Sequence, residues 1–294
     1  PHSEREKLKP GQYRVVVDST LEPGSLSYGE IIIPGQDSTE ILLSTYICHP
    51  SMANNELSGP VVTSMLVNWI ASTMRRHTYR IVFVPETIGS IVYLSRNLDR
   101  MKENTIAGFV INCVGDDRAY SYLPSRLGGT LADRVATQVL AHHAADFIRY
   151  SFLTRGSDER QYCSPGIDLP VASIMRTKYA CYPEYHTSKD DLSLISPAGL
   201  AGGFTALRKC LEVLEHNRIY RTTTLGEPHR AKWPFFDQFK SYEGPWQGRA
   251  IMNLISYADG KRDLLGIAEC AELDPHGCIP FIEQMLSAGL LAAD

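Results

Sequence analysis

The sequence predicts an α/β fold in which a mainly parallel, mixed sheet is covered by helices on both faces, followed by a small helical domain at the C-terminal end. Three observations predict it. Strand-like runs alternate with segments of helical spacing between residues 30 and 216, the order typical of parallel sheets. Several runs are apolar at nearly every position, as strands buried on both faces are. Polar clusters follow the runs where such sheets bind their ligands.

Length and composition limit the class of protein. The 294 residues allow about two domains, and the hydrophobic and charged fractions, 44% and 21%, are typical of soluble globular proteins. The net charge of −4 provides no general attraction for nucleic acids or anionic membranes, and the apolar runs are too short to cross a bilayer. We therefore expect neither a nucleic acid nor a membrane as a partner.

The cysteines indicate the compartment. All seven are scattered singly and none forms a C-x-x-C pair, which argues against a disulfide framework and for a reducing environment. The first residues, PHSEREKLKPG, are polar and charged, so no leader peptide is expected. We therefore expect a cytoplasmic protein.

The first elements are predicted from β-branched residues and apolar spacing. Residues 12–17 (QYRVVV) and 30–33 (EIII) are predicted strands separated by the turn-rich LEPGSLSYG. Residues 40–47 form a longer apolar run, the pattern of a buried strand. After a loop rich in Ser and Asn, apolar residues recur at helical spacing over residues 60–74.

The alternation then continues to residue 216. The same criteria, apolar runs for strands and apolar periodicity for helices, predict strands over residues 79–84, 107–114 and 169–174 and helices over residues 91–98, 131–143 and 197–216.

Five polar clusters follow predicted strands or lie close to them. Carboxyl ends of parallel strands meet at one edge of a sheet, so we expect the clusters to form one site. They comprise residues 49–59, 86–87, 112–117, 157–162 and 184–191.

Four phrases in these clusters carry a resemblance. The chain reads CHPSMANNELSG, PETIGSI, GSDERQYC and EYHTSKDDL. In order, they resemble the motif series of zinc-dependent aminopeptidases. They resemble more closely a family of bacterial aminopeptidase-like proteins, formerly a domain of unknown function, which carry CHPS-x-x-N-D-N-L-S-G in the first phrase and a winged helix at the C-terminal end. The resemblance implies the fold of zinc exopeptidases.

The resemblance also implies roles for single residues. His49 and His186 fall on the first and last zinc ligands, and Glu86 falls on the general base that activates a zinc-bound water. Asn55 falls on the bridging aspartate, so a neutral amide oxygen replaces a carboxylate as the third candidate ligand. The alternative for Glu86 is a carboxylate that stabilises a helix N-terminus, and that for Asn55 is a loop residue.

Further acids of the aminopeptidases are missing. Thr87 and Asn112 stand where those enzymes have acidic ligands, so we expect at most one zinc ion, and a site without an ion stays possible. Glu56 lies one residue beyond the lost aspartate. Compensation for that acid is one alternative for Glu56, and the other, which we expect of such a shift in a tight loop, is a side chain turned elsewhere. Asp158, with Glu159 beside it, is a candidate ligand or proton carrier, and we assign Asp158 a catalytic role.

Other polar residues of the clusters have less specific roles. Asp190 and Asp191 either cap the helix that follows or orient His186. Three side chains are candidate substrate contacts, with surface or packing roles as the alternative: Arg160, Tyr162 and Tyr185.

Composition divides the chain into three parts. Residues 1–216 form the predicted exopeptidase-like domain, and residues 217–248, rich in Arg, Pro and aromatic residues, a connector. Residues 249–294 contain three helical patterns and resemble a winged helix-turn-helix. They carry three basic against seven acidic residues, and the third helical pattern has no Lys or Arg. Because DNA binding requires phosphate neutralisation, we expect a packing role instead, with a homo-oligomer as one form of it.

Two functions from different classes remain. The first is a metal-dependent hydrolase of aminopeptidase or amidohydrolase type, acting on a peptide or an N-acylated small molecule. The resemblance places it near polysaccharide or secondary-metabolite biosynthesis. The alternative is a catalytically reduced binding or scaffold protein that has lost the standard metal site, as Asn55 indicates. A transcription factor with a hydrolase-like sensor domain is disfavoured by the acidic winged helix.

Overall fold

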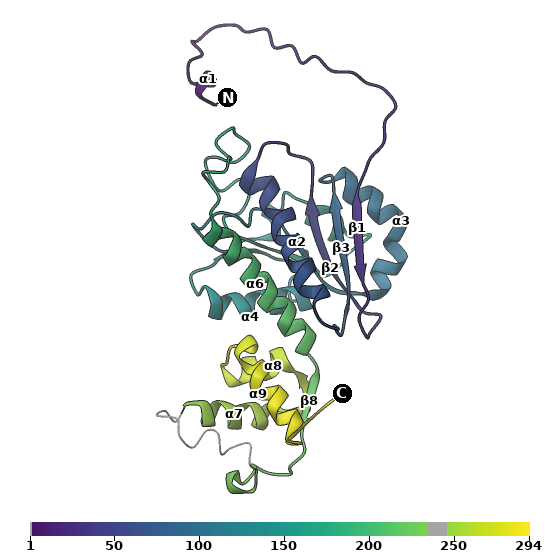
Figure 1. Cartoon of the computed structure of the whole chain (residues 1–294), viewed down its shortest axis with the longest axis vertical. Helices are drawn as coiled ribbons and strands as arrows, with labels where there is room; N and C mark the ends of the chain where they lie inside the picture. The colour runs from purple at the N-terminus through teal and green to yellow at the C-terminus, as the bar shows by residue number, and fades with distance from the viewer. Residues whose placement is uncertain (1, 234–245) are drawn as a thin grey trace. The chain divides into compact units, whose positions relative to one another are not determined.

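The computed structural model describes residues 2–233 and 246–294 and divides into two compact units (Figure 1). The first, the α/β unit, comprises residues 1–133 and 147–205, and the second, the C-terminal unit, comprises residues 134–146 and 206–294.

A seven-stranded mixed sheet forms the centre of the α/β unit. Its strand order is β1-β3-β2-β4-β7-β5-β6. The central strands β3, β2, β4 and β7 are parallel, whereas β1 and β5 run antiparallel to their inner neighbours. The predicted fold class, a mainly parallel mixed sheet, is thereby confirmed. The strands are β1 (Gly29–Ile33), β2 (Glu40–Tyr46), β3 (Thr78–Val84), β4 (Thr105–Val110), β5 (Ser121–Leu123), β6 (Ile148–Arg149) and β7 (Val171–Met175).

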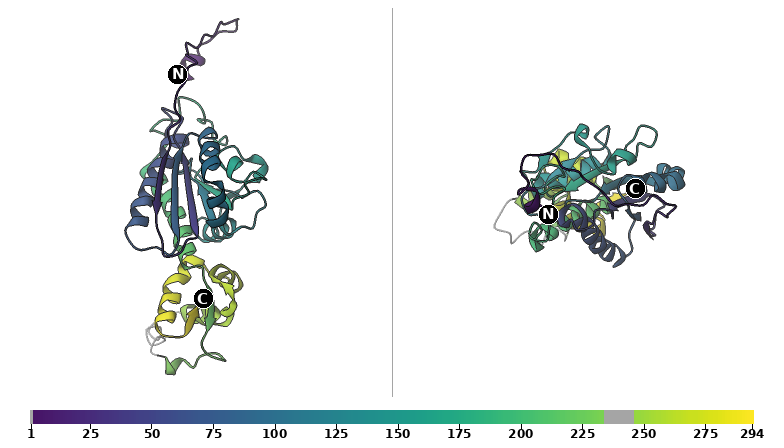
Figure 2. Two further views of the ribbon diagram at one scale, coloured as in Figure 1. Left: turned by 90° about the vertical axis from the view of Figure 1, so that its right-hand side faces the viewer. Right: turned by 90° about the horizontal axis from the view of Figure 1, so that it is seen from above.

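Helices cover both faces of this sheet. On one face, Leu42 of β2 shares a core cluster with Tyr93 and Leu94 of α3. On the other, α2 packs on β2 with a buried stripe that includes Val62 and Leu66 (Figures 1 and 2). The helices and short helical turns before residue 217 are α1 (His2–Arg5), η1 (Ala53–Leu57), α2 (Ser58–Ala71), α3 (Ile88–Asn104), α4 (Leu131–His143), η2 (Phe152–Thr154), α5 (Glu159–Tyr162) and α6 (Pro197–His216). Of these, α4 from residue 134 on and α6 from residue 206 on belong to the C-terminal unit.

The strand predicted over residues 12–17 is wrong. The structure assigns no strand there, and Val15, Val16 and Val17 are 83%, 72% and 79% exposed. β-branched residues favour a strand only when a partner strand and a buried face are available, and this segment has neither in the structure. The short strands β5 and β6 were not predicted, because runs of three and two residues show no periodicity.

The C-terminal unit contains the three predicted helices, α7 (Trp246–Tyr257), α8 (Leu264–Ala271) and α9 (Pro275–Ser287). A three-stranded antiparallel sheet in the order β10-β8-β9 accompanies them. Its strands are β8 (Ile219–Thr222), β9 (Asp259–Asp263) and β10 (Leu291–Ala293), and a 3-10 turn, η3, spans Arg230–Lys232.

The predicted connector, residues 217–248, therefore contributes β8 to this sheet, and its residues 234–245 lie outside the described part of the chain. The predicted domain boundaries stay predictions. Among the described residues, no helix has the length and apolar character required to cross a membrane.

Candidate functional site

Polar loops follow four parallel strands at the same edge of the sheet. Of these strands, β2 and β3 are labelled in Figure 1. β2 leads into Cys48 and His49, β3 into Glu86, and β4 into Asn112, while β7 leads into the loop that carries His186. The carboxyl ends of parallel strands lie side by side. The parallel pairing therefore brings residues that are distant along the chain to one place.

His49, Glu86 and His186 converge there. The His49 Nε2 lies 4.0 Å from Glu86 Oε2, and the imidazole rings of His49 and His186 have centroids 5.2 Å apart. The His49 and Glu86 side chains are 22% and 20% exposed, so solvent reaches both. The ring of Tyr185 stacks on that of His186, with the two centroids 3.9 Å apart. The structure therefore brings together the three residues on which the hydrolase hypothesis depends.

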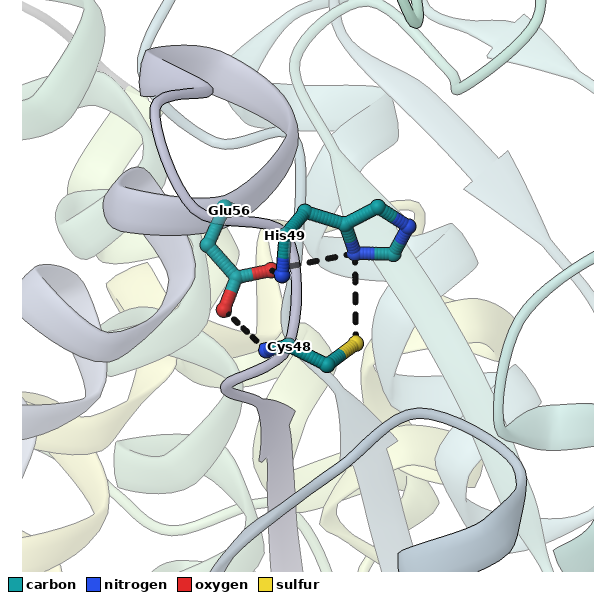
Figure 3. Close-up of side chains that lie close together, drawn as sticks. All are labelled: Cys48, His49 and Glu56. Atoms are coloured by element: carbon teal, nitrogen blue, oxygen red, sulfur yellow. Dashed lines mark hydrogen bonds and ion pairs between the residues drawn. The ribbon is translucent and has the colours of Figure 1, made fainter. Parts of the chain in front are cut away.

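Glu56 faces the same loop, in contrast to the expectation that it turns away. Its carboxylate accepts the Cys48 N–H at 2.6 Å and the His49 N–H at 2.9 Å, and lies 3.2 Å from His49 Nδ1 (Figure 3). The reason is that residues 53–57 form a π-helical turn, in which the Leu57 N–H bonds to the Met52 carbonyl five residues back. A wider turn changes the direction of each side chain.

Asn55 is held by its neighbours but keeps one oxygen free. Its Nδ2 donates to the Tyr46 hydroxyl at 2.7 Å, and its backbone N–H donates to Asp190 at 3.1 Å. Its Oδ1 is buried and has no partner among the residues that the structure describes. Tyr46 was not singled out from the sequence, because it ends an apolar strand.

Asp190 and Asp191, which follow His186 in the chain, each accept hydrogen bonds that hold a loop. Asp190 is fully buried and accepts hydrogen bonds from the backbone of Asn54 and Asn55 and from the Tyr182 hydroxyl. It thereby fixes the turn that carries Asn55. Asp191 accepts hydrogen bonds from Ser193 in an exposed local turn.

Asp158 supports the loop beside Glu86. It is fully buried, and its Oδ1 accepts the Thr87 N–H at 2.7 Å and the Ser90 hydroxyl at 2.8 Å. Thr87 has a left-handed φ of 63°, which costs free energy for a β-branched residue, so these bonds help to hold it. The structure shows Asp158 as a support of this loop, whereas its assigned catalytic role stays a prediction.

Burial changes the proton affinity of these groups. It raises the pKa of the Glu86 carboxyl above its ordinary value, an effect that the Ser157 hydrogen bond and the charge of Arg160 offset only in part. It raises the pKa of Asp158 to about 7, against the bonds from Thr87 and Ser90. Desolvation and the neighbouring His49 lower the pKa of His186, which favours the neutral imidazole that binds metals.

Four buried oxygen atoms near this edge lack a partner among the described residues. Buried polar atoms are nearly always paired with protein, water or a ligand. Two of the four residues that bear these atoms make other hydrogen bonds. Glu159 accepts from the Gly156 N–H and from the Tyr179 hydroxyl, and the Asn112 amide donates to the Ser157 hydroxyl. Unmet acceptors of this kind indicate a site that water, a cation or a hydrogen-bond donor completes. They are Asn55 Oδ1, Asn112 Oδ1, Asp158 Oδ2 and Glu159 Oε2.

One group among the described residues has the spacing of metal ligands. The ligand atoms of Cys48, His49 and Glu56 lie within 4.8 Å of one another. The Glu56 oxygens, however, already accept two backbone N–H groups, and desolvation raises the pKa of the Cys48 thiol to about 11, far from the thiolate that binds metals. Of the three, His49 is the best ligand.

The three candidate substrate contacts have different positions in the structure, and two of them lie at the site. Arg160 is exposed and its Nη2 donates to the Thr87 hydroxyl at 2.8 Å, and Tyr185 lies against His186. Tyr162 is a correction: it has no exposed surface, belongs to the core beside β2, and bonds with its hydroxyl to Ser44. Positions 160 and 162 of a helical turn point to opposite sides, so only one of them can face the site.

Comparison with known families agrees with this architecture. Residues 10–217 match the model of a family described as a domain of unknown function (DUF4910), and residues 218–293 match a winged helix-turn-helix model.

A curated relative and a crystal structure, both from Clostridium acetobutylicum, are similar over most of the chain. The relative, described as a polysaccharide biosynthesis protein with an aminopeptidase-like domain, is 39% identical over 265 residues, which cover 90% of this chain. This chain spans 61% of that relative's length. The crystal structure, described as that of a peptidase, has a TM-score of 0.87 and 35% identity, and the match covers 99% of this chain and 66% of the crystallised chain.

More distant structures share the fold alone. A zinc aminopeptidase of Bacillus subtilis has a TM-score of 0.50 at 18% identity over 61% of this chain and 47% of its own. A glutaminyl cyclase of Porphyromonas gingivalis has a TM-score of 0.50 at 16% identity over 62% of this chain and 75% of its own. The sheet with its covering helices is thus an aminopeptidase-like fold.

Proposed function

From the premise that this chain belongs to the DUF4910 family, joined to a winged helix-turn-helix, we propose that its α/β unit is a metal-dependent hydrolase of aminopeptidase type. The observation that carries the proposal is the convergence of two imidazoles and one carboxylate, those of His49, His186 and Glu86, at the carboxyl edge of the sheet.

The donor groups fit one divalent ion. The rings of His49 and His186 lie 5.2 Å apart between centroids, and the buried Oδ1 of Asn55 lacks a partner among the described residues, so these three groups would hold the ion. Two imidazoles with an oxygen ligand suit zinc. They do not fit a second ion, because Asn55, Thr87 and Asn112 stand where the aminopeptidases have acids. A zinc ion at this place supplies a Lewis acid that polarises a carbonyl and lowers the pKa of water.

Glu86 is the proton carrier in this proposal. Its carboxylate is partly exposed and lies 4.0 Å from His49, so it can accept the proton of an attacking water and pass it to the leaving amine. The exposed Arg160 and the ring of Tyr185 lie beside it and are available to bind the acyl group or its carboxylate. Their contact with substrate follows from position alone and is part of the proposal.

The substrate class is a peptide or an N-acylated small molecule. Both kinds of substrate present an amide carbonyl to the same group of side chains. The description of the Clostridium relative combines polysaccharide biosynthesis with an aminopeptidase-like domain. We extend that combination to this chain as the hypothesis that an amide of a small metabolite is cleaved. Its site of action in the cell, proposed as the cytoplasm, follows from the single cysteines.

The test combines metal analysis with turnover. Protein purified without chelator is expected to contain about one zinc per chain. His186→Ala should lose the metal, whereas Glu86→Gln should keep it and lose most of its turnover on aminoacyl anilides or N-acyl sugars, because it removes the proton carrier alone. Turnover of such an amide that is unaffected by Glu86→Gln would contradict the proposal.

A second function is favoured by one observation, the absence of three acids. Asn55, Thr87 and Asn112 leave the site with less negative charge than the aminopeptidases have, as expected for a binding or scaffold protein that retained the fold. That function requires that purified protein contains no metal and that no amide is cleaved, while a small molecule still protects the chain against thermal unfolding.

A further inference from the structure

We propose that Glu56 is a positioning residue that fixes the orientation and tautomer of His49, so that Nδ1 carries the proton and Nε2 is left as the free lone pair. The proposal rests on the proposed function in one respect, that His49 is a ligand. It concerns a residue whose side chain the sequence did not place at the site.

The contacts around His49 Nδ1 carry the first step. The Glu56 side chain is 8% exposed, and its Oε2 lies 3.2 Å from Nδ1 (Figure 3). The Cys48 Sγ lies at the same distance, 3.2 Å, from Nδ1. Because a thiol is only a weak donor and acceptor, whereas an ionised carboxylate oxygen is a strong acceptor that cannot donate, we infer that Nδ1 carries the hydrogen atom and donates it to Glu56. In a neutral imidazole, Nε2 then has no hydrogen atom and is the metal-binding nitrogen.

The same carboxylate fixes the backbone that carries the ring. Its Oε1 accepts the Cys48 N–H at 2.6 Å, and its Oε2 accepts the His49 N–H at 2.9 Å. Both oxygens are therefore engaged by the loop itself, and the carboxylate is a support of the ligand rather than a ligand. Carboxylates that accept the second N–H of a metal-binding imidazole orient the ring and increase its basicity.

The free nitrogen points to the remaining groups of the site. His49 Nε2 is the atom 4.0 Å from Glu86 Oε2, and the ring lies 5.2 Å from that of His186. The tautomer that Glu56 imposes is thus the one in which the lone pair faces the candidate metal position.

The local backbone determines where this carboxylate lies. Glu56 follows directly after Asn55, the residue that the resemblance places on the bridging aspartate. The π-helical turn of residues 53–57 directs its side chain to His49 Nδ1. Its negative charge is therefore available to support a ligand.

The test begins with the metal-free full chain. Protein labelled with 15N in its histidines is studied by two-bond 1H–15N NMR, and the His49 signals are assigned by their loss in His49→Asn. The expected result for the neutral ring is a proton on Nδ1. A proton on Nε2 overturns the proposal, and this measurement needs no variant at position 56.

Variants then separate positioning from folding. Glu56→Gln should shift the His49 ring toward the other tautomer and weaken zinc binding about 10- to 100-fold in a chelator competition, while Glu103→Gln, an exposed matched change, should alter neither. If Glu56→Gln leaves the tautomer and the zinc Kd unchanged, the positioning role is excluded and the hydrolase proposal is unaffected. If wild type binds no zinc but its tautomer depends on Glu56, the hydrolase proposal fails and the positioning role stands.

Discussion

At the residue scale, Asn55 determines the charge of the candidate metal site. Its amide nitrogen bonds to Tyr46, and its buried oxygen lacks a partner within the described residues. A neutral amide oxygen attracts a divalent cation less than a carboxylate does. The site is therefore expected to bind zinc more weakly than one with an aspartate at this position.

Asn55→Asp is expected to tighten zinc binding at least about tenfold, because it adds a negative charge to a site for a doubly charged ion. The fold should be retained, since the Tyr46 hydroxyl can donate to the new carboxylate as readily as it accepts from the amide. Competition with a chelator measures the change. Asn104→Asp, the same change at the C-terminal end of α3, should have no effect, and an equal gain in zinc affinity there would contradict the explanation.

Asp158 makes stability depend on pH. Its pKa is raised from 3.8 to about 7 by burial, so between about pH 4 and pH 7 the folded state keeps a proton that the unfolded state has lost. Stability therefore falls as the pH rises through this window, and the loss is complete above it. At full size the effect is about 4 kcal/mol.

Asp158→Asn is expected to remove this loss, because an amide keeps the acceptor for Thr87 and Ser90 without a charge that must be desolvated. The variant should melt at a higher temperature than wild type at pH 8 and at nearly the same temperature at pH 4. Thermal unfolding at the two pH values measures it. A shift of the same size at both would show that the charge of Asp158 has no part in it.

At the element scale, a buried ion pair joins β2 to β3. Arg80 donates to both oxygens of Glu40 at 2.6 and 2.9 Å, and the two side chains are 2% and 1% exposed. These strands are parallel neighbours at the centre of the sheet, and β2 and β3 lead to His49 and Glu86. The ion pair therefore links the two strands that position the loops of His49 and Glu86.

Arg80→Met is expected to lower the free energy of unfolding by about 3 kcal/mol, because it leaves the Glu40 charge buried with less compensation. The double variant Arg80→Met/Glu40→Met should recover much of this loss, since it removes both desolvated charges. Urea unfolding midpoints of the two variants and wild type decide it. A double variant less stable than the single one would contradict the assignment to an uncompensated charge.

At the scale of the whole molecule, the winged helix is expected to contact protein. Residues 249–294 carry three basic and seven acidic residues, and α9, where DNA-binding relatives have the recognition helix, contains no Lys or Arg. Neutralisation of phosphates supplies most of the non-specific affinity for DNA. A packing or dimerisation role, with a homo-oligomer as one outcome, is our proposal for this domain.

The full chain should therefore show no saturable binding to duplex DNA at about 10 µM protein, a concentration within the range of ordinary non-specific binding. Fluorescence anisotropy at low and at physiological salt measures this, and light scattering in the same buffers reports the oligomeric state. Affinity that decreases steeply with salt would show phosphate contacts and contradict the proposal.

Local patterns predicted much of the fold and of the site. The helix over residues 197–216 has the predicted bounds, because apolar periodicity is a property of the helix itself. His49, Glu86 and His186 were found through phrases in loops at the ends of strands, and parallel pairing explains why they meet. The prediction of a strand over residues 12–17 failed, because a strand also needs a partner strand, which a local pattern does not reveal.

By itself, then, the sequence determined most of the alternating strands and helices of the α/β unit, because apolar spacing is a property of a short segment. The resemblance of four phrases singled out the three residues at the edge of the sheet. Only the tertiary structure decided the directions of side chains. The π-helical turn directed Glu56 toward His49, and the helical turn of α5 directed Tyr162 into the core. Direction depends on the local turn geometry and on the elements packed around it, which residues distant along the chain supply.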